Sequence, residues 1–482
     1  MQMQSIWNRT AESKPHAALR GDLTIDAAVI GGGMAGILIA YFLKQRGLEV
    51  AVLEAGTVGS GQTGNTTAKI TSQHGLIYHK LLETLGKDMA RAYAEANQRA
   101  VWEYKRIIRE RSIHCCFEQK PAFLYSLEET ESLMREAEAA SRLGIEAMFT
   151  TDTELPFPVK GAVCFEGQAQ FHPLQFLFAL ERELLVYEHT NVTAVEENRI
   201  LTPNGIVTAK HIIFATHYPF LNVPGYYFMR MHQERSYVLA LQNAMRLEGM
   251  YLGIDKNNGW SLRSAGELLL LGGGNHRTGE NRNGGKYRLL REKAQEFWPG
   301  STEIACWSAQ DCMTLDGVPY IGQFSESTPH WYVATGFQKW GMTSSMLSAM
   351  LLSDLITGRE NPWQKAFSPQ RFTPGASAKS MLEDGLHAVR DLSRRIFAPA
   401  RADVEALPLG HGGVVERDSE KVGVYRDDTG QTYVVSIRCP HLGCQLEWNP
   451  DEKSWDCPCH GSRFDYRGNL IDNPAQEDLS HD

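Results

Sequence analysis

The sequence TIDAAVIGGGMAGILIAYFLKQRGLEVAVLE, residues 24–54, predicts the fold of the N-terminal part of the chain. The β-branched, apolar run over 24–30 is typical of a buried strand, and a glycine-rich turn follows at 31–36. The apolar stretch after the turn predicts a helix closed by Gly47, and a second apolar run ends at Glu54. Strand, glycine turn, helix and strand in this order form a βαβ unit.

The turn fits the dinucleotide-binding pattern G-x-G-x-x-G, with Gly31, Gly33 and Gly36 at its glycine positions. Glycine is required because the backbone must approach a pyrophosphate closely, and the helix N-terminus then supplies free N–H groups and partial positive charge. Glu54, eighteen residues beyond Gly36, would accept hydrogen bonds from ribose hydroxyls. The pattern does not separate FAD from NAD, and the alternative is a tight turn without a ligand.

Four further segments resemble the flavoprotein family of glycine, sarcosine and D-amino acid oxidases. They are SGQTGNTTA at 60–68, IIFATH at 212–217, DGVPYIG at 316–322 and YVATGFQKWGMT at 332–343. The resemblance covers roughly residues 20–370 and implies FAD as the cofactor. In that family the glycine turn meets the pyrophosphate, the segment after the second strand passes the flavin, and the late loop closes over the ring. The implied FAD-binding residues are Gly31, Gly33, Met34, Ala35, Gly36, Glu54, Ala55, Thr63, Gly64, Asn65, Thr66, Val195, Ala215, Thr216, Gly336, Trp340, Gly341, Met342 and Thr343.

A second dinucleotide site is not evident in the sequence. The segment LLLLGGGNHRTG at 268–279 comes closest to the pattern, but Arg277 stands where the third glycine belongs. Flavin reductases that take electrons from NAD(P)H usually need such a second site. We therefore expect a flavin that an organic substrate reduces directly.

The same resemblance implies a small amine or amino acid as the substrate, oxidised at its C–N bond by hydride transfer to the flavin. Three polar residues are candidate catalytic groups. Arg263, on a predicted strand, would clamp a carboxylate, and His276, after a buried-type strand, would face the flavin. Lys339, in the late loop, would stabilise the reduced, anionic flavin. The alternatives are an ion-paired arginine, a turn histidine and a solvated lysine.

Four of the nine cysteines fall between residues 439 and 459. The segments CPHLGC at 439–444 and CPCHGS at 457–462 give C-x-H, fifteen residues, then C-x-x-H, and they closely resemble the Rieske [2Fe–2S] signature. The iron ligands implied by this resemblance are Cys439, His441, Cys457 and His460. It also implies a disulfide between Cys444 and Cys459, and the alternative is a tetrahedral Cys₂His₂ zinc site.

Two residues near the second motif bear on the cluster's reduction potential. Ser462 matches a serine that hydrogen-bonds a cluster sulfur and raises the potential in the Rieske family. Phe464 stands where a tyrosine usually donates a second hydrogen bond. We therefore expect a potential below the upper end of the family range.

Composition bounds the other possibilities. The chain has 482 residues and a formal charge of −9, so nucleic acid is not expected as a partner. No run of ~20 apolar residues predicts a membrane span, and the N-terminus lacks the apolar core of a secretory signal. We therefore expect a cytoplasmic protein.

The predicted fold is an α/β FAD-binding Rossmann-type domain with an α+β antiparallel-sheet substrate domain, followed by a small all-β Rieske domain. The predicted FAD-binding domain comprises 1–80, 161–220 and 312–372, and the substrate domain comprises 81–160, mainly helical, and 221–311. A linker helix at 373–405, amphipathic over 376–397, leads to the Rieske domain at 406–482.

A flavin and a Rieske cluster in one chain predict an electron path from substrate through FAD and cluster to an unknown external acceptor, although the reverse flow is also open. One alternative is an oxygen-using amine oxidase with a structural or sensing cluster, and another is an electron carrier without its own organic substrate. A Rieske oxygenase is disfavoured. His74 and His79 have suitable spacing for its mononuclear iron, but no aspartate precedes them at the right distance.

Overall fold

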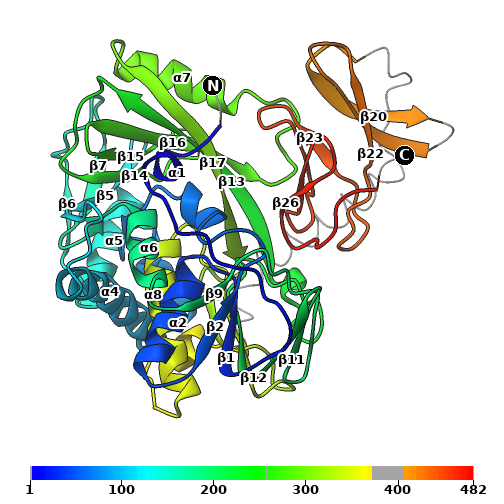
Figure 1. Ribbon diagram of the computed structural model, residues 1–482. Helices are drawn as coiled ribbons and strands as arrows, with labels where there is room; N and C mark the ends of the chain where they lie inside the picture. Colours follow the sequence, from blue (N-terminus) through cyan, green and yellow to red (C-terminus); the bar gives the residue numbers. More distant parts are fainter. Residues whose placement is uncertain (1–2, 257, 372–406, 418–419, 481–482) are drawn as a thin grey trace.

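The computed structural model describes residues 3–256, 258–371, 407–417 and 420–480. The part of the chain before residue 372 contains two eight-stranded sheets and a small three-stranded sheet, together with helices (Figure 1). Two smaller sheets form the C-terminal domain. The predicted linker helix at 373–405, with its amphipathic stretch, lies outside the described residues.

The first sheet contains the predicted βαβ unit. Strand β1 (Leu23–Ile30) pairs in parallel with β2 (Val50–Leu53), and helix α2 (Met34–Gln45) connects the two. On its other side β1 pairs in parallel with β12 (Gly205–Phe214). The remaining strands of this sheet are β9 (Leu185–Tyr187), β10 (Ala194–Glu196), β11 (Arg199–Thr202), β18 (Tyr320–Gln323) and β19 (Trp331–Thr335). The Rossmann-type prediction is confirmed.

Helix α2 carries apolar residues on nearly every side, and other elements cover it on nearly every side. It packs against α8 (Gly341–Ile356) and α6 (Pro173–Glu181), and its inner face meets β1 and β2 (Figure 1). A helix enclosed in this way buries its residues around the whole circumference, which explains the missing polar stripe in its sequence.

The second sheet is largely antiparallel, with one parallel pair between β14 and β5. In spatial order its strands are β17 (Thr302–Thr314), β13 (Met231–Gln242), β16 (Leu268–Arg277), β15 (Ser261–Ala265), β14 (Met250–Gly253), β5 (Ala122–Ser126), β7 (Gly161–Phe165) and β6 (Ala147–Thr150). Strand β7 pairs with β5 and β6 and therefore belongs to this sheet, although the predicted boundary placed it in the FAD-binding part. The segment 81–160 likewise supplies two strands, β5 and β6, as well as helices.

Amphipathic helices pack on the second sheet and against helix α8. Helix α4 (Lys87–Glu110) buries alanine, tyrosine and isoleucine side chains at helical spacing and exposes its charged residues. The others are α3 (Tyr78–Thr84), α5 (Glu131–Arg142) and α7 (Lys286–Phe297). The short elements are α1 (Ile6–Thr10), α9 (Gln364–Phe367), β3 (Lys69–Ile70), β4 (Glu118–Gln119), β8 (Ala169–Gln170), η1 (Gln62–Asn65) and η2 (Tyr227–Met229).

The described part of the C-terminal domain is built from strands and turns, as predicted. Its strands are β20 (His411–Arg417), β21 (Glu420–Arg426), β22 (Thr432–Ser436), β23 (Glu447–Asn449), β24 (Ser454–Asp456), β25 (Arg463–Asp465) and β26 (Leu470–Asp472). Trp455 and Phe464 are completely buried in a core that belongs to this domain. In Figure 1 the domain lies beside the large antiparallel sheet.

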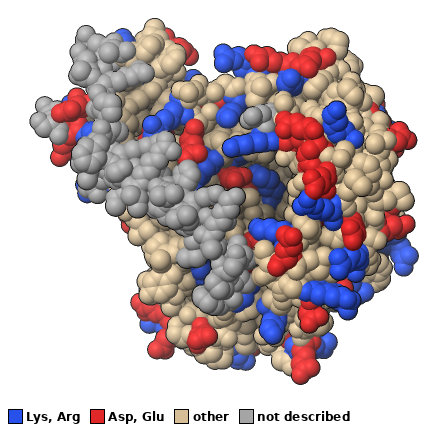
Figure 2. Space-filling view, turned by 180° about the vertical axis from the view of Figure 1, so that it is seen from behind, with Lys and Arg blue, Asp and Glu red and all other residues tan. Residues whose placement is uncertain are grey.

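The surface fits the composition. On the face shown in Figure 2, Lys and Arg side chains alternate with Asp and Glu side chains and form no field of a single sign. Within the described ranges, none of the helices combines the length and the apolar character that crossing a bilayer requires.

Candidate functional site

The glycine turn between β1 and α2 tolerates no side chain at its first and third glycines. Gly31 has φ +109°, and a Cβ atom there would lie 2.4 Å from the backbone oxygen of Ala215. A Cβ atom on Gly36 would lie 1.8 Å from the oxygen of Gly31. Gly33 is the N-cap of α2 and has no side chain to cap the helix; the N–H of Met34 donates to the hydroxyl of Thr63 at 2.9 Å, and the N-terminus of the helix lies at the turn. An anion such as a pyrophosphate fits this helix N-terminus.

Glu54 lies at the end of β2, where the fingerprint predicts the ribose-binding acid. Its carboxylate accepts hydrogen bonds from the N–H of Gly32 at 2.6 Å and from the N–H of Gly56 at 2.7 Å. Burial raises the pKa of Glu54, and these two donors partly oppose the shift. The backbone therefore fixes the acid beside the glycine turn.

A cavity of about 760 Å³ begins at the glycine turn and continues beneath the antiparallel sheet. Fourteen of the predicted FAD-binding residues line it: Gly31, Gly33, Met34, Ala35, Glu54, Ala55, Thr63, Asn65, Thr66, Ala215, Thr216, Trp340, Gly341 and Met342. The other five, which lie outside the lining, are Gly36, Gly64, Val195, Gly336 and Thr343. Val192, three residues before Val195, lines the cavity instead. Contact of these residues with FAD stays a prediction.

The predicted catalytic arginine and histidine do not line the cavity. The Arg263 guanidinium donates to the backbone oxygen of Ala68 at 2.7 Å, and only 2% of the residue is exposed. The His276 ring contacts the hydroxyl of Tyr237 at 3.0 Å and the backbone oxygen of Arg277 at 2.7 Å. Both side chains therefore make contacts within the protein, outside the space available to a substrate.

Lys339 does line the cavity, as predicted from its loop. Its ammonium group lies 3.1 Å from a carboxylate oxygen of Glu234 and 3.1 Å from one of Asp311. Burial opposes the charged form, but the two carboxylates outweigh it and raise the pKa of Lys339 above its ordinary value. The charge of Lys339 is therefore already compensated within the protein.

Sequence reasoning missed a second cavity-lining lysine, Lys69 on β3. Its ammonium group donates to the backbone oxygen of Tyr251 at 2.7 Å and to the hydroxyl of Ser261 at 2.9 Å. Among the described residues, no carboxylate lies within ion-pair distance of it. Burial and the neighbouring Arg263 lower the pKa of Lys69 to about 7. No local motif marks this residue, because its position depends on packing against β14 and β15.

His74, one of the two histidines considered for a mononuclear iron, is engaged by the protein. Its ring contacts the Tyr93 hydroxyl at 2.6 Å and the Thr71 backbone oxygen at 2.7 Å, and it stacks on Trp340. Burial lowers the pKa of His74 to about 3. Both ring nitrogens thus have partners in the protein.

The four predicted cluster ligands come together from two loops of the C-terminal domain. Cys439 and Cys457 are buried, with 1% exposed, and the rings of His441 and His460 lie 4.9 Å apart. The Nδ1 atoms of both histidines are buried and have no hydrogen-bond partner. Buried polar atoms without partners are costly unless a ligand satisfies them. Two thiols and two free Nδ1 atoms form the donor set that a Rieske cluster needs, so the residues fit the group.

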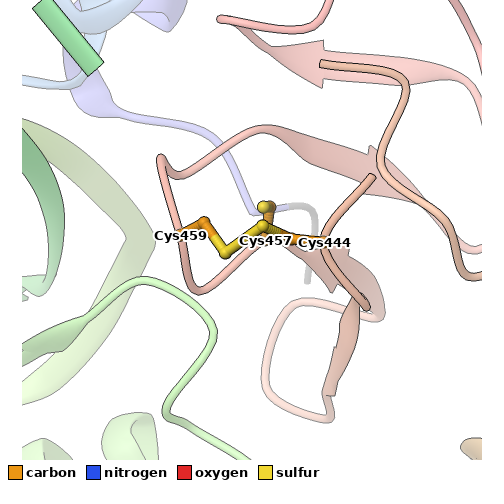
Figure 3. A group of neighbouring side chains, drawn as sticks. All are labelled: Cys444, Cys457 and Cys459. Atoms are coloured by element: carbon orange, nitrogen blue, oxygen red, sulfur yellow. A yellow bond between two sulfur atoms is a disulfide. The ribbon is translucent and has the colours of Figure 1, made fainter. Parts of the chain in front are cut away.

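A disulfide joins Cys444 to Cys459 and ties the two ligand loops together, as the Rieske resemblance implied (Figure 3). The three sulfur atoms of Cys444, Cys457 and Cys459 all lie within 4.8 Å of one another. A hydrogen bond with the Cys457 side chain lowers the pKa of the Cys439 thiol, and a hydrogen bond with the Ser462 side chain adds to this shift. Phe464 is fully buried and offers no hydroxyl group.

Comparison with known proteins gives the same two parts. The family model described as FAD dependent oxidoreductase (DAO) matches residues 26–355, and the model described as Rieske [2Fe-2S] domain matches residues 400–481. Fold and site thus define a flavoprotein oxidoreductase with a fused iron–sulfur domain. The chain belongs to the DAO family of FAD-dependent oxidoreductases. It binds FAD in its larger part and a [2Fe–2S] cluster in its Rieske domain.

A curated relative matches along almost the whole chain. It is YhfW of Bacillus subtilis (strain 168), whose name describes a Rieske 2Fe-2S iron–sulfur protein, and it is 36% identical over 99% of this chain and 97% of its own length. Part of the chain also matches iron–sulfur subunit 1 of the cytochrome b6-f complex of Cyanophora paradoxa. That subunit is 30% identical over 26% of this chain and 50% of its own length.

Solved structures of amino-acid-oxidising flavoproteins share the fold of the larger part. Glycine oxidase from Geobacillus kaustophilus has a TM-score of 0.62 at 21% identity, over 73% of this chain and 99% of its own. L-proline dehydrogenase from P. horikoshii has a TM-score of 0.61 at 20% identity, over 74% of this chain and 99% of its own. At these identities the likeness shows the fold alone.

Proposed function

We propose that this protein oxidises a small amine or amino acid at its C–N bond and delivers the electrons singly, through its own Rieske cluster, to an external acceptor. Bound FAD accepts two electrons as hydride, whereas a [2Fe–2S] cluster carries one at a time. The observation that supports this proposal is that the Rieske domain forms part of the wall of the cavity lined by the predicted FAD-binding residues.

The Rieske domain itself forms part of the cavity lining. Its lining residues are Leu470, Ile471, Asp472, Asn473, Ala475 and Gln476. Asn473 donates to the backbone oxygens of Thr216 at 2.9 Å and Tyr218 at 2.8 Å, at the end of β12. These bonds hold the Rieske segment against the predicted flavin-binding strand, so the cavity is completed only when the domain is docked.

Two glutamines link the cavity wall to the loop that carries His460. The Gln310 amide, from a cavity-lining position on β17, donates to the backbone oxygen of Gly461 at 2.8 Å. The Gln233 amide donates to the backbone oxygen of His460 at 2.7 Å and lies against Gln310. Both glutamines are almost fully buried, and Gln310 alone spans from the cavity wall to the ligand loop.

An anaerobic screen of amines and amino acids tests the proposed function. The true substrate should bleach both the flavin absorption and the Rieske absorption of the full-length protein. Bleaching of the flavin alone, with hydrogen peroxide formed stoichiometrically in air, would contradict electron transfer through the cluster. If a reduced partner protein bleaches the flavin and Rieske absorption and none of the amines or amino acids does, the proposed substrate oxidation is contradicted.

Lys69 is expected to bind the carboxylate of an amino-acid substrate, because its charge has no anionic partner among the described residues. Removing one charge-assisted hydrogen bond costs about 1.5–3 kcal/mol, so Lys69→Met should lower kcat/KM for the amino acid by about tenfold to a hundredfold. In the wild type the affinity should fall as pH rises above about 7, since the pKa of Lys69 lies there and the neutral amine attracts no anion.

The matched control for Lys69 is the substrate itself. The corresponding amine without a carboxylate should react equally well with the wild type and with Lys69→Met, and Lys69→Arg should retain most of the preference for the amino acid. Equal losses for both substrates in Lys69→Met would mean that the lysine only supports the structure, through its hydrogen bonds to Tyr251 and Ser261.

A further inference from the structure

The outer edges of both histidine ligands are covered by one loop of the larger, flavin-binding part of the chain. The Nε2 atom of His441 lies 2.6 Å from the side-chain oxygen Oδ1 of Asn222. The His460 ring hydrogen-bonds the backbone of Phe228 and also meets the Phe228 ring edge to face. The Nε2 edge of His441 and the ring of His460 are therefore turned toward the larger part of the chain.

The chemistry of the ligands assigns the direction of the Asn222 bond. Both Nδ1 atoms are the buried, unpartnered atoms that would meet iron, so a neutral His441 carries its hydrogen on Nε2. Nε2–H is a donor, and the amide oxygen facing it is an acceptor. An outer partner of this kind orients a metal-bound imidazole and increases its basicity.

The loop that carries Asn222 is itself fixed. The backbone oxygen of Asn222 accepts from the N–H of Tyr226 at 2.9 Å, and the Tyr227 hydroxyl donates to the backbone oxygen of Phe324 at 2.8 Å. Arg230 donates to the backbone oxygen of Gly225 at 2.9 Å. Tyr227 shares a core with Phe324 and other residues of the first sheet, so this loop belongs with the FAD-binding sheet, although the predicted boundary places it in the substrate domain.

We propose that Asn222 is a positioning residue which sets the reduction potential of the Rieske cluster from outside the Rieske domain, by accepting the Nε2 hydrogen of His441. Acceptance of this hydrogen increases the electron density on the imidazole. The oxidised cluster carries more positive charge than the reduced one and gains more from that density. The bond therefore lowers the potential, and it exists only while the two parts of the chain are docked.

The test is the cluster potential of the full-length holoprotein, measured by redox titration with EPR detection and without any substrate. Asn222→Leu removes the acceptor at similar size and should raise the potential by about 59 mV, which is a tenfold shift in a one-electron equilibrium. Asn222→Asp places a full negative charge at the same atom and should lower the potential. Shifts of opposite sign identify an electrostatic effect on the ligand, because loosened packing would move both variants in the same direction.

Asn281→Leu is the matched control at the same interface. Asn281 donates to Asn449 at 3.0 Å and to Asp451 at 2.9 Å, both in the Rieske domain and neither a ligand. Its loss should leave the potential unchanged. An unchanged potential in Asn222→Leu, or an equal shift in Asn281→Leu, would overturn the proposal. Should Asn222→Leu fail to load its cluster, the sign of the Asn222→Asp shift decides.

This inference rests on the cluster and not on the identity of the substrate. Chemical reductants poise the cluster in the titration, so a protein that oxidises no amine still gives a clear result for Asn222. Conversely, if the Asn222 variants shift the potential as expected, this result says nothing about the substrate, and the anaerobic screen alone tests the proposed oxidation.

Discussion

Replacement of His441 by alanine is expected to remove the Rieske EPR signal while FAD stays bound. The His441 Nδ1 atom is buried without a partner, its ring lies 4.9 Å from that of His460, and Cys439 and Cys457 are both buried. Without His441, one iron of the cluster would lack one of its protein ligands, and the cluster would not be held in this buried site. Iron and sulfide analysis, flavin absorbance and EPR of the purified variant measure the three expected outcomes.

The matched control for His441 is His411 in the same domain. His411 is exposed, and its ring contacts only the nearby backbone oxygen of Leu409 among the described residues. His411→Ala should therefore keep its cluster and its spectrum. An unchanged EPR signal in His441→Ala would refute the ligand assignment. Loss of both FAD and cluster would instead mean that the variant had failed to fold.

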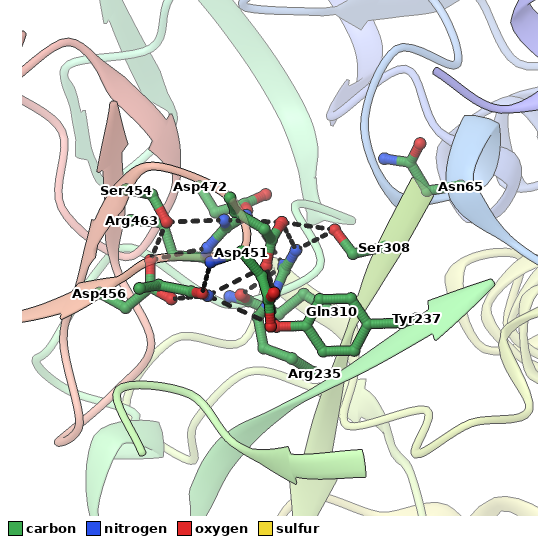
Figure 4. A network of polar contacts seen from close by, with 12 residues as sticks. Asn65, Arg235, Tyr237, Ser308, Gln310, Asp451, Ser454, Asp456, Arg463 and Asp472 are labelled. Carbon is green, nitrogen blue, oxygen red and sulfur yellow. Dashed lines mark hydrogen bonds and ion pairs between the residues drawn. The ribbon is translucent and has the colours of Figure 1, made fainter. Parts of the chain in front are cut away.

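Arg463→Met is expected to give the largest loss of stability among the variants considered. Figure 4 shows Arg463 within a buried network of charges between the Rieske domain and the antiparallel sheet. Its guanidinium lies 3.0 Å from carboxylate oxygens of Glu452, Asp456 and Asp472. Only 5% of the Arg463 side chain is exposed. Removing the arginine leaves these buried carboxylates short of a positive partner, a situation that costs about 3–5 kcal/mol.

The network also joins the two parts of the chain. Arg235 on β13 donates to Glu452 at 3.0 Å, and the Gln62 amide donates to Asp472 at 2.9 Å. Asp472 lines the cavity, so loss of Arg463 should disturb both docking and the flavin environment. Urea unfolding followed by cluster absorbance and by flavin fluorescence should show the cluster transition at a lower midpoint than in the wild type.

Arg467→Met is the control for Arg463. Arg467 is exposed and stacks over Tyr433 and Tyr466 within the same domain. Exposed substitutions of this kind usually change stability by less than about 0.5 kcal/mol. Equal midpoints for Arg463→Met and the wild type would show that the buried network contributes nothing net to docking.

The Rossmann-type fold and the ligand set of the cluster were predictable because their requirements are local. Gly31 and Gly36 are needed by the turn itself, where any side chain would strike backbone atoms. The cysteines and histidines of the cluster lie on two short loops, so their spacing along the chain records the geometry of the site. The boundaries between the FAD-binding and substrate domains were not predictable in the same way. Strand β7 belongs to the antiparallel sheet because pairing partners distant in sequence decide where a short strand goes.

Arg263 shows where local reasoning ends. Ser261 lines the cavity, and Arg263 is two residues further along β15, on the same face of the strand. The cavity ends between these two positions, and Ala68 binds the guanidinium beyond it. Lys69, which no motif marked, lines the cavity, and its side chain bonds Tyr251 of β14 and Ser261 of β15.

The sequence by itself determined the two cofactors and the folds that hold them, because a tight turn and a spaced ligand set impose backbone and side-chain requirements within a few residues. Tertiary structure alone decided how the cluster loops lie against the larger part of the chain. Asn222 and His441 are 219 residues apart in the chain, and Gln310 and Gly461 are 151 apart. Such pairs leave no periodic or local pattern, since each depends on two surfaces that meet only after both domains have folded.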